Sequence, residues 1–210
     1  MSMHLSDKIN RAIKSIYHQF YGHMGYRTID GLCRQALKPF GIRTTFTFSD
    51  ELESGDFTIA GQYDSERKRQ PIQITLVFSR QDIGRDFSWN DTKRKRFCFE
   101  LSQVSQHECI HRKQNDQREI EVIGYKVEKD SQKQQQTYLS NKDEIEAYAH
   151  DIALEINEFY SRHKRKEVLA KLSRKRFLVS YQIYKDAFSG NWKAVHDRLC
   201  KKIVKWLEKL

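Results

Sequence analysis

The five residues His107-Glu108-Cys109-Ile110-His111 constrain this chain more than any other stretch. In a helix the two histidines lie about one turn apart on one face, so both imidazoles can reach a single zinc ion. The glutamate between them points toward the open coordination position, where it can accept a proton from a water molecule. The H-E-x-x-H pattern therefore predicts a helix with an ionisable face, and it makes Zn²⁺ the expected cofactor.

The residues around this motif predict the required helix, from about Thr92 to Gln114. Its apolar stripe is formed by Phe97, Leu101 and Val104. The positions of Glu108 and His111 continue the same stripe, so the helix face changes from apolar to ionisable at the motif. A pair of structural histidines is the alternative interpretation. Cys109 lies roughly 200° around the helix from His107, which favours a packing role over metal ligation.

Upstream of the motif, the hydrophobic period changes along the chain. Apolar residues recur at helical spacing over about residues 6–20 and 28–38. They then alternate with polar residues over about 42–48, 57–63 and 72–78, which predicts three strands. An antiparallel sheet or meander is the simplest arrangement of these strands. The predicted fold class is therefore α+β, with N-terminal helices and a small antiparallel sheet packed on the H-E-x-x-H helix.

Downstream of the motif, the pattern is mostly helical. A β-like segment is predicted around residues 120–127, and the Gln-rich stretch 132–136 reads as a loop or hairpin tip. A clear helix is predicted from Ser140 to about Tyr160, followed by helices at roughly 166–188 and 191–208. The predicted organisation is a domain over residues 1–160 and a basic helical C-terminal extension over 161–210, packed on that domain.

Charge is concentrated at the C-terminal end. Residues 161–210 contain 15 Lys or Arg against 4 Asp or Glu, a local charge of +11, although the whole chain carries +10. Such an asymmetry is typical of a surface for nucleic acid or another acidic partner, and equally of solvated amphipathic helices.

The rest of the composition bears on the cellular compartment. No apolar run is long enough for a membrane span, and the first residues lack the layout of a secretory signal. The four cysteines are scattered and form no C-x-x-C pair. These features predict no membrane partner and a reducing cytoplasm.

A catalytic zinc site needs a third protein ligand besides the two histidines. Gln114 and Gln117 stand where the metzincin pattern needs glycine and histidine, so the ligand must come from another element. The helix after Asn141 offers Glu144 and Glu146, and periodicity does not choose between them. Glu144 has a competing role in a capping box with Asn141, Glu146 has one as a solvated position, and His150 is a more distant third choice.

The two motifs together resemble a known group. H-E-x-x-H on one helix followed by E-x-x-A on a later helix is similar to the gluzincin class of zinc metallopeptidases, and the layout resembles small metallopeptidases encoded by tailed phages. The resemblance covers about residues 40–160. It implies a zincin-like fold, with His107 and His111 as ligands, Glu108 as general base and Glu144 as third ligand. Tyr148 stands where some gluzincins have an acidic residue, so no carboxylate is assigned to orient a histidine.

The leading functional prediction is zinc-dependent hydrolysis of a peptide bond in a peptide or protein substrate, in the cytoplasm, or in the host cytoplasm for a phage-encoded protein. An oxyanion-stabilising donor is expected but not selected. The candidates for it are Tyr125, Tyr138, Tyr148, Tyr160 and His163. The alternative is a nucleic-acid-binding or interaction protein with a structural or vestigial zinc site, suggested by aromatic residues interleaved with the basic segment. A hybrid would use the basic helices to deliver a peptidase to protein bound on nucleic acid.

Overall fold

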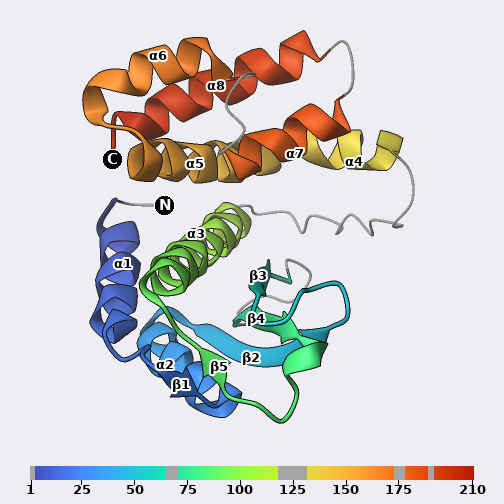
Figure 1. Ribbon diagram of the computed structural model, residues 1–210. Coiled ribbons are helices and arrows are strands. Elements are labelled where there is room, and N and C mark those ends of the chain that lie inside the picture. The colour runs from blue at the N-terminus through green and yellow to red at the C-terminus, as the bar shows by residue number, and fades with distance from the viewer. Residues whose placement is uncertain (1–2, 65–70, 118–131, 173–177, 189–191) are drawn as a thin grey trace. The chain divides into compact units, whose positions relative to one another are not determined.

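A computed structural model of the chain describes residues 3–64, 71–117, 132–172, 178–188 and 192–210. It has an α+β fold with a C-terminal helical region (Figure 1). The chain divides into two compact units, Met1–Glu121 and Val122–Leu210, and each is described by itself. The predicted boundary lay after residue 160. The observed division is earlier because helix α5 packs with the C-terminal helices.

In its described residues, the first unit combines three α-helices with two small sheets. Its long helix α3 contains the H-E-x-x-H motif and closely matches the prediction for residues 92–114. The elements are α1 (Met3–Tyr17), β1 (His23–Met24), α2 (Tyr26–Leu37), η1 (Lys38–Phe40), β2 (Ile42–Ser49), β3 (Phe57–Gln62), β4 (Ile72–Ser79), η2 (Arg80–Asp82), β5 (Phe87–Ser88) and α3 (Asp91–Asp116).

The larger sheet corrects the predicted antiparallel meander. Its strand order is β2-β4-β3, with β2 parallel to β4 and β3 antiparallel to it. The last strand in sequence takes the centre because β4 is the most apolar of the three, and none of its residues is exposed. The three strands themselves lie where the alternating pattern predicted them.

The connection between β2 and β3 must cross the end of β4 to allow this order. Ser79, at the end of β4, donates a hydrogen bond to the Leu52 carbonyl over 2.8 Å. The carboxylate of Asp82 accepts from the Ser54 hydroxyl at 2.5 Å and from the Gly55 backbone N–H at 2.6 Å. These bonds satisfy polar groups of the crossing loop and hold it against the sheet.

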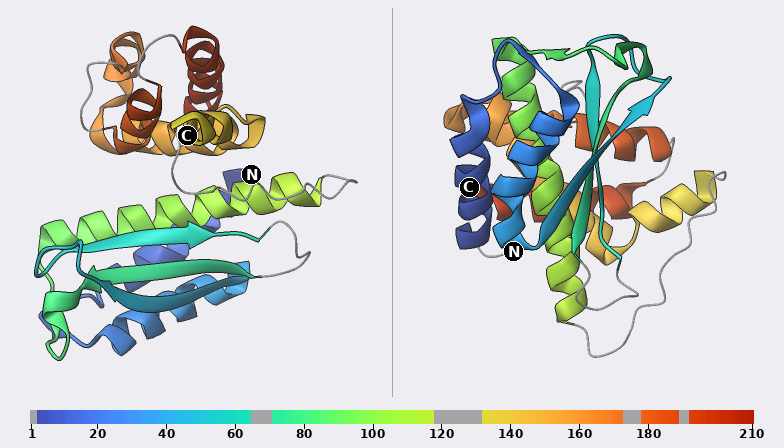
Figure 2. Two further views of the ribbon diagram at one scale, coloured as in Figure 1. Left: turned by 90° about the vertical axis from the view of Figure 1, so that its right-hand side faces the viewer. Right: turned by 90° about the horizontal axis from the view of Figure 1, so that it is seen from below.

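The core of the first unit lies between the sheet and its helices. Figure 2 shows α1, α2 and α3 on one side of the sheet. Alternate residues of β3, such as Phe57 and Ile59, are buried on that side, while their neighbours Thr58 and Ala60 are exposed. This is the alternation expected of a sheet with one covered face. Aromatic rings, among them Phe20, Trp89 and Phe97, fill the end of the core where α3 begins.

The second unit consists of helices in its described part, with α5 in contact with α4, α6, α7 and α8. The predicted helix at 166–188 is wrong as a single element, since α6 ends at Ala170 and α7 begins at Val179. The β-like segment predicted at 120–127 falls entirely outside the described residues. The elements are α4 (Gln132–Leu139), α5 (Lys142–Phe159), η3 (Arg162–Lys164), α6 (Arg165–Ala170), α7 (Val179–Ala187) and α8 (Lys193–Leu207).

The Gln-rich stretch is helical, not the loop or hairpin tip predicted for it. It forms most of α4, and the side chains of Gln132 and Gln136 donate to the Ala187 carbonyl at 3.4 and 2.8 Å. Ala187 is the last residue of α7, whose terminal carbonyls lack partners within the helix. The glutamines therefore stabilise α4 by capping another helix, which is a tertiary contact that local propensity does not reveal.

Among the described helices, none combines the length and the apolar character that crossing a bilayer requires.

Candidate metal centre

Helix α3 positions the motif through contacts at both its ends. Asn90 caps the helix by accepting a hydrogen bond from the Lys93 backbone N–H at 2.8 Å. Phe97 and Leu101 are fully buried and anchor the first half of the helix in the core. Toward the other end, the Arg112 guanidinium donates to the Phe40 carbonyl at 2.9 Å. The motif therefore lies on a helix fixed on both sides.

A buried polar cluster next to the motif joins α3 to α1. The Gln106 amide donates to Asn10 Oδ1 at 3.0 Å and to Ser102 Oγ at 2.8 Å, and its oxygen accepts from the Ser6 hydroxyl. Since Gln106 precedes His107 directly, these bonds set the rotation of α3 about its axis. That rotation decides which way the imidazoles point.

The two histidines of the motif converge. His107 Nε2 and His111 Nε2 lie 3.0 Å apart, with the ring centroids 4.7 Å apart and the rings inclined by 69°. Two nitrogens bound to one tetrahedral zinc at about 2.0–2.1 Å would lie roughly 3.3 Å from each other. The pair therefore has nearly the separation that zinc ligation requires.

Gln114 contacts the far side of the second histidine. Its Oε1 lies 3.1 Å from His111 Nδ1. With Nδ1 as the donor in this contact, Nε2 keeps its lone pair on the side of His107. Sequence reasoning considered Gln114 only as a mismatch to the metzincin pattern and missed this contact, although its place one turn after His111 was the available clue.

Glu108 lies against the sheet at a glycine. Its side chain is 8% exposed, and a methyl group on Gly61 of β3 would come within 2.7 Å of Glu108 Cγ and Oε1. Val104 Cγ1 would be met at the same distance. Gly61 follows Phe57 and Ile59 at alternate positions on the helix-facing side of β3. Because Gly61 has no side chain, the Glu108 carboxylate fits beside the strand where the face of α3 changes from apolar to ionisable. In the sequence, an isolated glycine inside a strand pattern is a signal of such a close approach.

The three candidates for a third ligand lie on α5 in the second unit, whereas both histidines belong to the first. Glu144 is in the first turn of α5. Asn141 caps this helix through the Asp143 N–H at 3.0 Å, and its own N–H donates to the Tyr138 carbonyl at 3.0 Å. A capping box would direct that N–H to Glu144.

Glu146 and His150 have partners of their own within the second unit. The Glu146 carboxylate forms a salt bridge with the Lys202 ammonium of α8. His150 is fully buried, and its ring packs edge-on against Trp206 with the centroids 4.7 Å apart. Both side chains therefore contribute to the packing of α5 on α8.

The candidate oxyanion donors are also found in the second unit, apart from Tyr125, which lies outside the described residues. The Tyr148 ring packs against that of Tyr184 at 5.4 Å between centroids. His163 Nε2 lies 3.3 Å from the Ser161 hydroxyl on the surface. Tyr138 is in α4, and Tyr160 follows α5. None of these contacts selects a donor.

Cys109 packs in the core of the first unit, as predicted. Burial raises the pKa of its thiol to about 11, so the sulfur is protonated at neutral pH. Because metal ligation needs the thiolate, this burial also disfavours Cys109 as a ligand.

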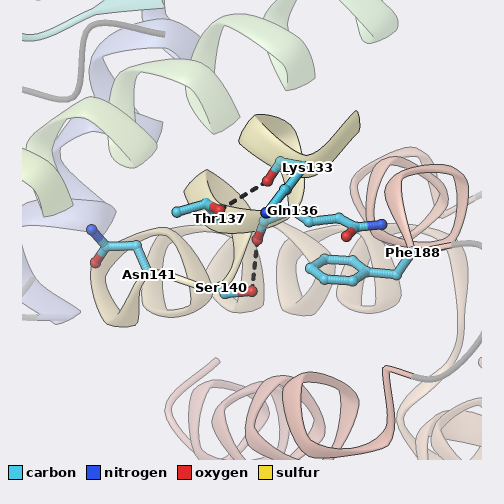
Figure 3. Close-up of a pocket in the computed structure, with 6 residues that line it drawn as sticks. All are labelled: Lys133, Gln136, Thr137, Ser140, Asn141 and Phe188. Carbon is cyan, nitrogen blue, oxygen red and sulfur yellow. Dashed lines mark hydrogen bonds between the residues drawn. The ribbon is translucent and has the colours of Figure 1, made fainter. Parts of the chain in front are cut away.

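A pocket of about 570 Å³ in the second unit contains none of the predicted site residues (Figure 3). The Thr137 hydroxyl donates to the Lys133 backbone carbonyl at 2.8 Å, and the Ser140 hydroxyl donates to that of Gln136 at 2.6 Å. These two hydroxyls of the pocket lining therefore form hydrogen bonds with the backbone of their own segment.

Comparison with known proteins found no matching family model, and neither a curated protein nor a solved structure matches the chain.

Proposed function

We propose that the protein is a zinc-dependent metallopeptidase with a gluzincin-like centre. The observation that carries this proposal is the convergence of His107 Nε2 and His111 Nε2, 3.0 Å apart on a fixed helix, beside the buried carboxylate of Glu108. Two imidazoles that can hold a metal ion and a neighbouring glutamate that can act as general base are the groups that the H-E-x-x-H motif supplies to a metallopeptidase.

Glu144 is the proposed third ligand. His107, His111 and Glu144 together offer two imidazole nitrogens and one carboxylate oxygen, a donor set that could hold a metal ion. The salt bridge of Glu146 with Lys202 favours Glu144 over Glu146, because ligation by Glu146 would leave the lysine without its counter-ion.

The proposed reaction assigns a role to each residue. When bound, zinc would polarise the scissile carbonyl and lower the pKa of a water molecule. Glu108 would accept the proton of the attacking water and deliver it to the leaving amine. Gln114 would hold His111 in the tautomer that ligates through Nε2.

The edge strand β3 supplies a place for the substrate. Among the described strands, β3 pairs on one side only, with β4, and Gly61 brings it against Glu108. An extended peptide could add to the other side through backbone hydrogen bonds, with its scissile bond near the general base. This mode fits an unfolded or flexible segment of a protein as substrate.

Metal analysis and a peptidase assay on purified variants test the proposal. We expect one zinc per wild-type chain, none in His107→Ala, and a bound zinc without hydrolysis in Glu108→Gln, with a loss of rate of at least about 100-fold. The matched pair Glu144→Gln and Glu146→Gln should differ, since only the first removes a ligand.

Four outcomes would contradict parts of this proposal. Full zinc content in His107→Ala would exclude the metal centre. Hydrolysis at the wild-type rate by zinc-loaded Glu108→Gln would exclude the general base. Zinc loss in Glu146→Gln with retention in Glu144→Gln would reverse the third-ligand assignment, whereas zinc without hydrolysis of any peptide would favour a structural metal.

A further inference from the structure

Helix α8 has a basic edge formed by Arg198, Lys201 and Lys205. Successive members are three and four residues apart, so they follow one line along the helix surface. All three are exposed. The line extends over roughly 10 Å at 1.5 Å per residue. Since each residue of a helix is rotated by about 100° from the one before, Asp197 and Glu208 fall next to each other on one side of this basic line.

The neighbouring cations on the other side are engaged within the unit. Lys202 forms the salt bridge with Glu146, and the Lys209 ammonium lies 4.3 Å from the centroid of the Trp206 ring. By contrast, the described residues contain no carboxylate within salt-bridge distance of Arg198, Lys201 or Lys205. The Arg198 Nε–H donates to the Ala194 carbonyl at 3.3 Å, which leaves its terminal nitrogens outside that bond.

We propose that the basic edge of α8 binds the phosphate backbone of nucleic acid. Each strand of a duplex presents one negative charge per roughly 3.4 Å of axis, and a row of cations on one helix edge complements such a linear array. Lysine ammonium groups act as flexible point charges suited to phosphate, and arginine adds a fork for two phosphate oxygens. Residues 161–210 contain 15 basic and 4 acidic residues, so this segment also produces a long-range positive potential that attracts a polyanion.

The same helix fits an anionic membrane poorly. A membrane-surface helix has large apolar side chains exposed beside its cations. On α8 the apolar side is turned into the unit, where Leu199 and Ile203 are fully buried and Trp206 is 4% exposed. Val204 is the largest apolar side chain exposed on this helix, at 42%. Charge complementarity without an apolar anchor favours nucleic acid.

Fluorescence anisotropy with labelled single-stranded and duplex oligonucleotides of random sequence tests this proposal on the full chain. The test variant is Lys201→Glu with Lys205→Glu. The control is Arg11→Glu with Lys14→Glu, which makes the same change in net charge at exposed positions of α1. We expect the Kd of the test variant to rise at least about tenfold, and the slope of log K against log salt to fall by about two. The control should bind like wild type.

Several results would overturn the proposal. Equal weakening in both variants would show a response to net charge alone. An unchanged salt slope in the test variant would exclude phosphate contacts by these lysines. Binding to vesicles of anionic phospholipid, with none to oligonucleotides, would assign the edge to a membrane. Circular dichroism checks that each variant is folded. The milder Lys201→Gln with Lys205→Gln variant removes both charges without adding negative ones, so it serves as a second test if the glutamate variant misfolds. Zinc-site variants such as Glu108→Gln should bind nucleic acid normally, so this proposal and the proposed hydrolysis fail independently.

Discussion

Among single residues, Gly61 of β3 matters to the candidate metal centre because it makes room for the side chain of Glu108. The strand has no side chain at the position that faces the motif, and the carboxylate occupies that space. A core position on a strand normally selects a β-branched or aromatic residue. Glycine here weakens the strand, and the room it leaves for Glu108 is the compensating gain.

The substitution Gly61→Ala tests this close approach. The added methyl group would meet three atoms of Glu108 and Val104 at 2.7 Å, so the side chains must shift. We expect a loss of about 1–3 kcal/mol in the free energy of unfolding, measured in urea, together with slower peptide hydrolysis.

Gly31→Ala is the matched control. Gly31 lies inside α2, is exposed, and has no atom within 4 Å of an added Cβ. Alanine should stabilise the helix there by about 0.5–1 kcal/mol. The same sign of change at both glycines would show that contact with Glu108 is not what distinguishes Gly61.

Among the elements, helix α7 is capped at both ends by side chains of other helices. The N-cap residue of α7, Leu178, provides no side-chain hydrogen bond. Glu155 of α5 takes that role from a distance of 25 positions in sequence, accepting from the Ser180 backbone N–H at 3.1 Å and from its hydroxyl at 2.8 Å. Together with the glutamines of α4 at the other end, this explains why so short a helix as α7 has a fixed place.

Removal of this distant cap should destabilise the second unit. Glu155 is 2% exposed, and Glu155→Ala would leave the Ser180 donors buried without their acceptor. We expect a loss of about 2–3 kcal/mol in urea unfolding monitored by far-UV circular dichroism. Glu158→Ala, at an exposed position of the same helix, should stay within about 0.5 kcal/mol of wild type. An equal response of both variants would exclude Glu155 as a specific cap.

At the scale of the whole molecule, burial of thiols links stability to pH. Burial raises the pKa of Cys98 to about 12, and it raises that of Cys33 well above its ordinary value. In the unfolded chain both thiols would ionise near pH 8.5–9. Because the folded pKa is the higher one, the stabilisation is fully present below the unfolded pKa and is lost as pH rises toward the folded pKa.

Urea unfolding at pH 7.5, 9 and 10.5 should therefore show a falling free energy of unfolding, by up to about 1.4 kcal/mol per pH unit for each buried thiol. Cys98→Ala should reduce the steepness of this fall between the two higher values. A pH profile identical to that of wild type would mean that ionisation of Cys98 does not contribute.

Local patterns in the sequence were sufficient to predict several elements of the fold. Alternation marked β2, β3 and β4, helical spacing marked α3 and α5, and the motif placed His107 and His111 on one helix face. These predictions depend on which residues share one face of a helix or strand, and the spacing of apolar residues along the sequence indicates that face. The same reasoning named Glu144 and Glu146 but could not separate them, since both lie on the same short stretch of one helix.

The features that depend on partners distant in sequence became visible in the folded structure. It placed β4 at the centre of a mixed sheet, brought Gly61 to Glu108, and paired Glu146 with Lys202. It also turned the Gln-rich stretch into a helix that caps α7. In each case the free energy comes from burial or from a polar contact that forms only after the chain has folded back on itself, so the local pattern does not identify the partner.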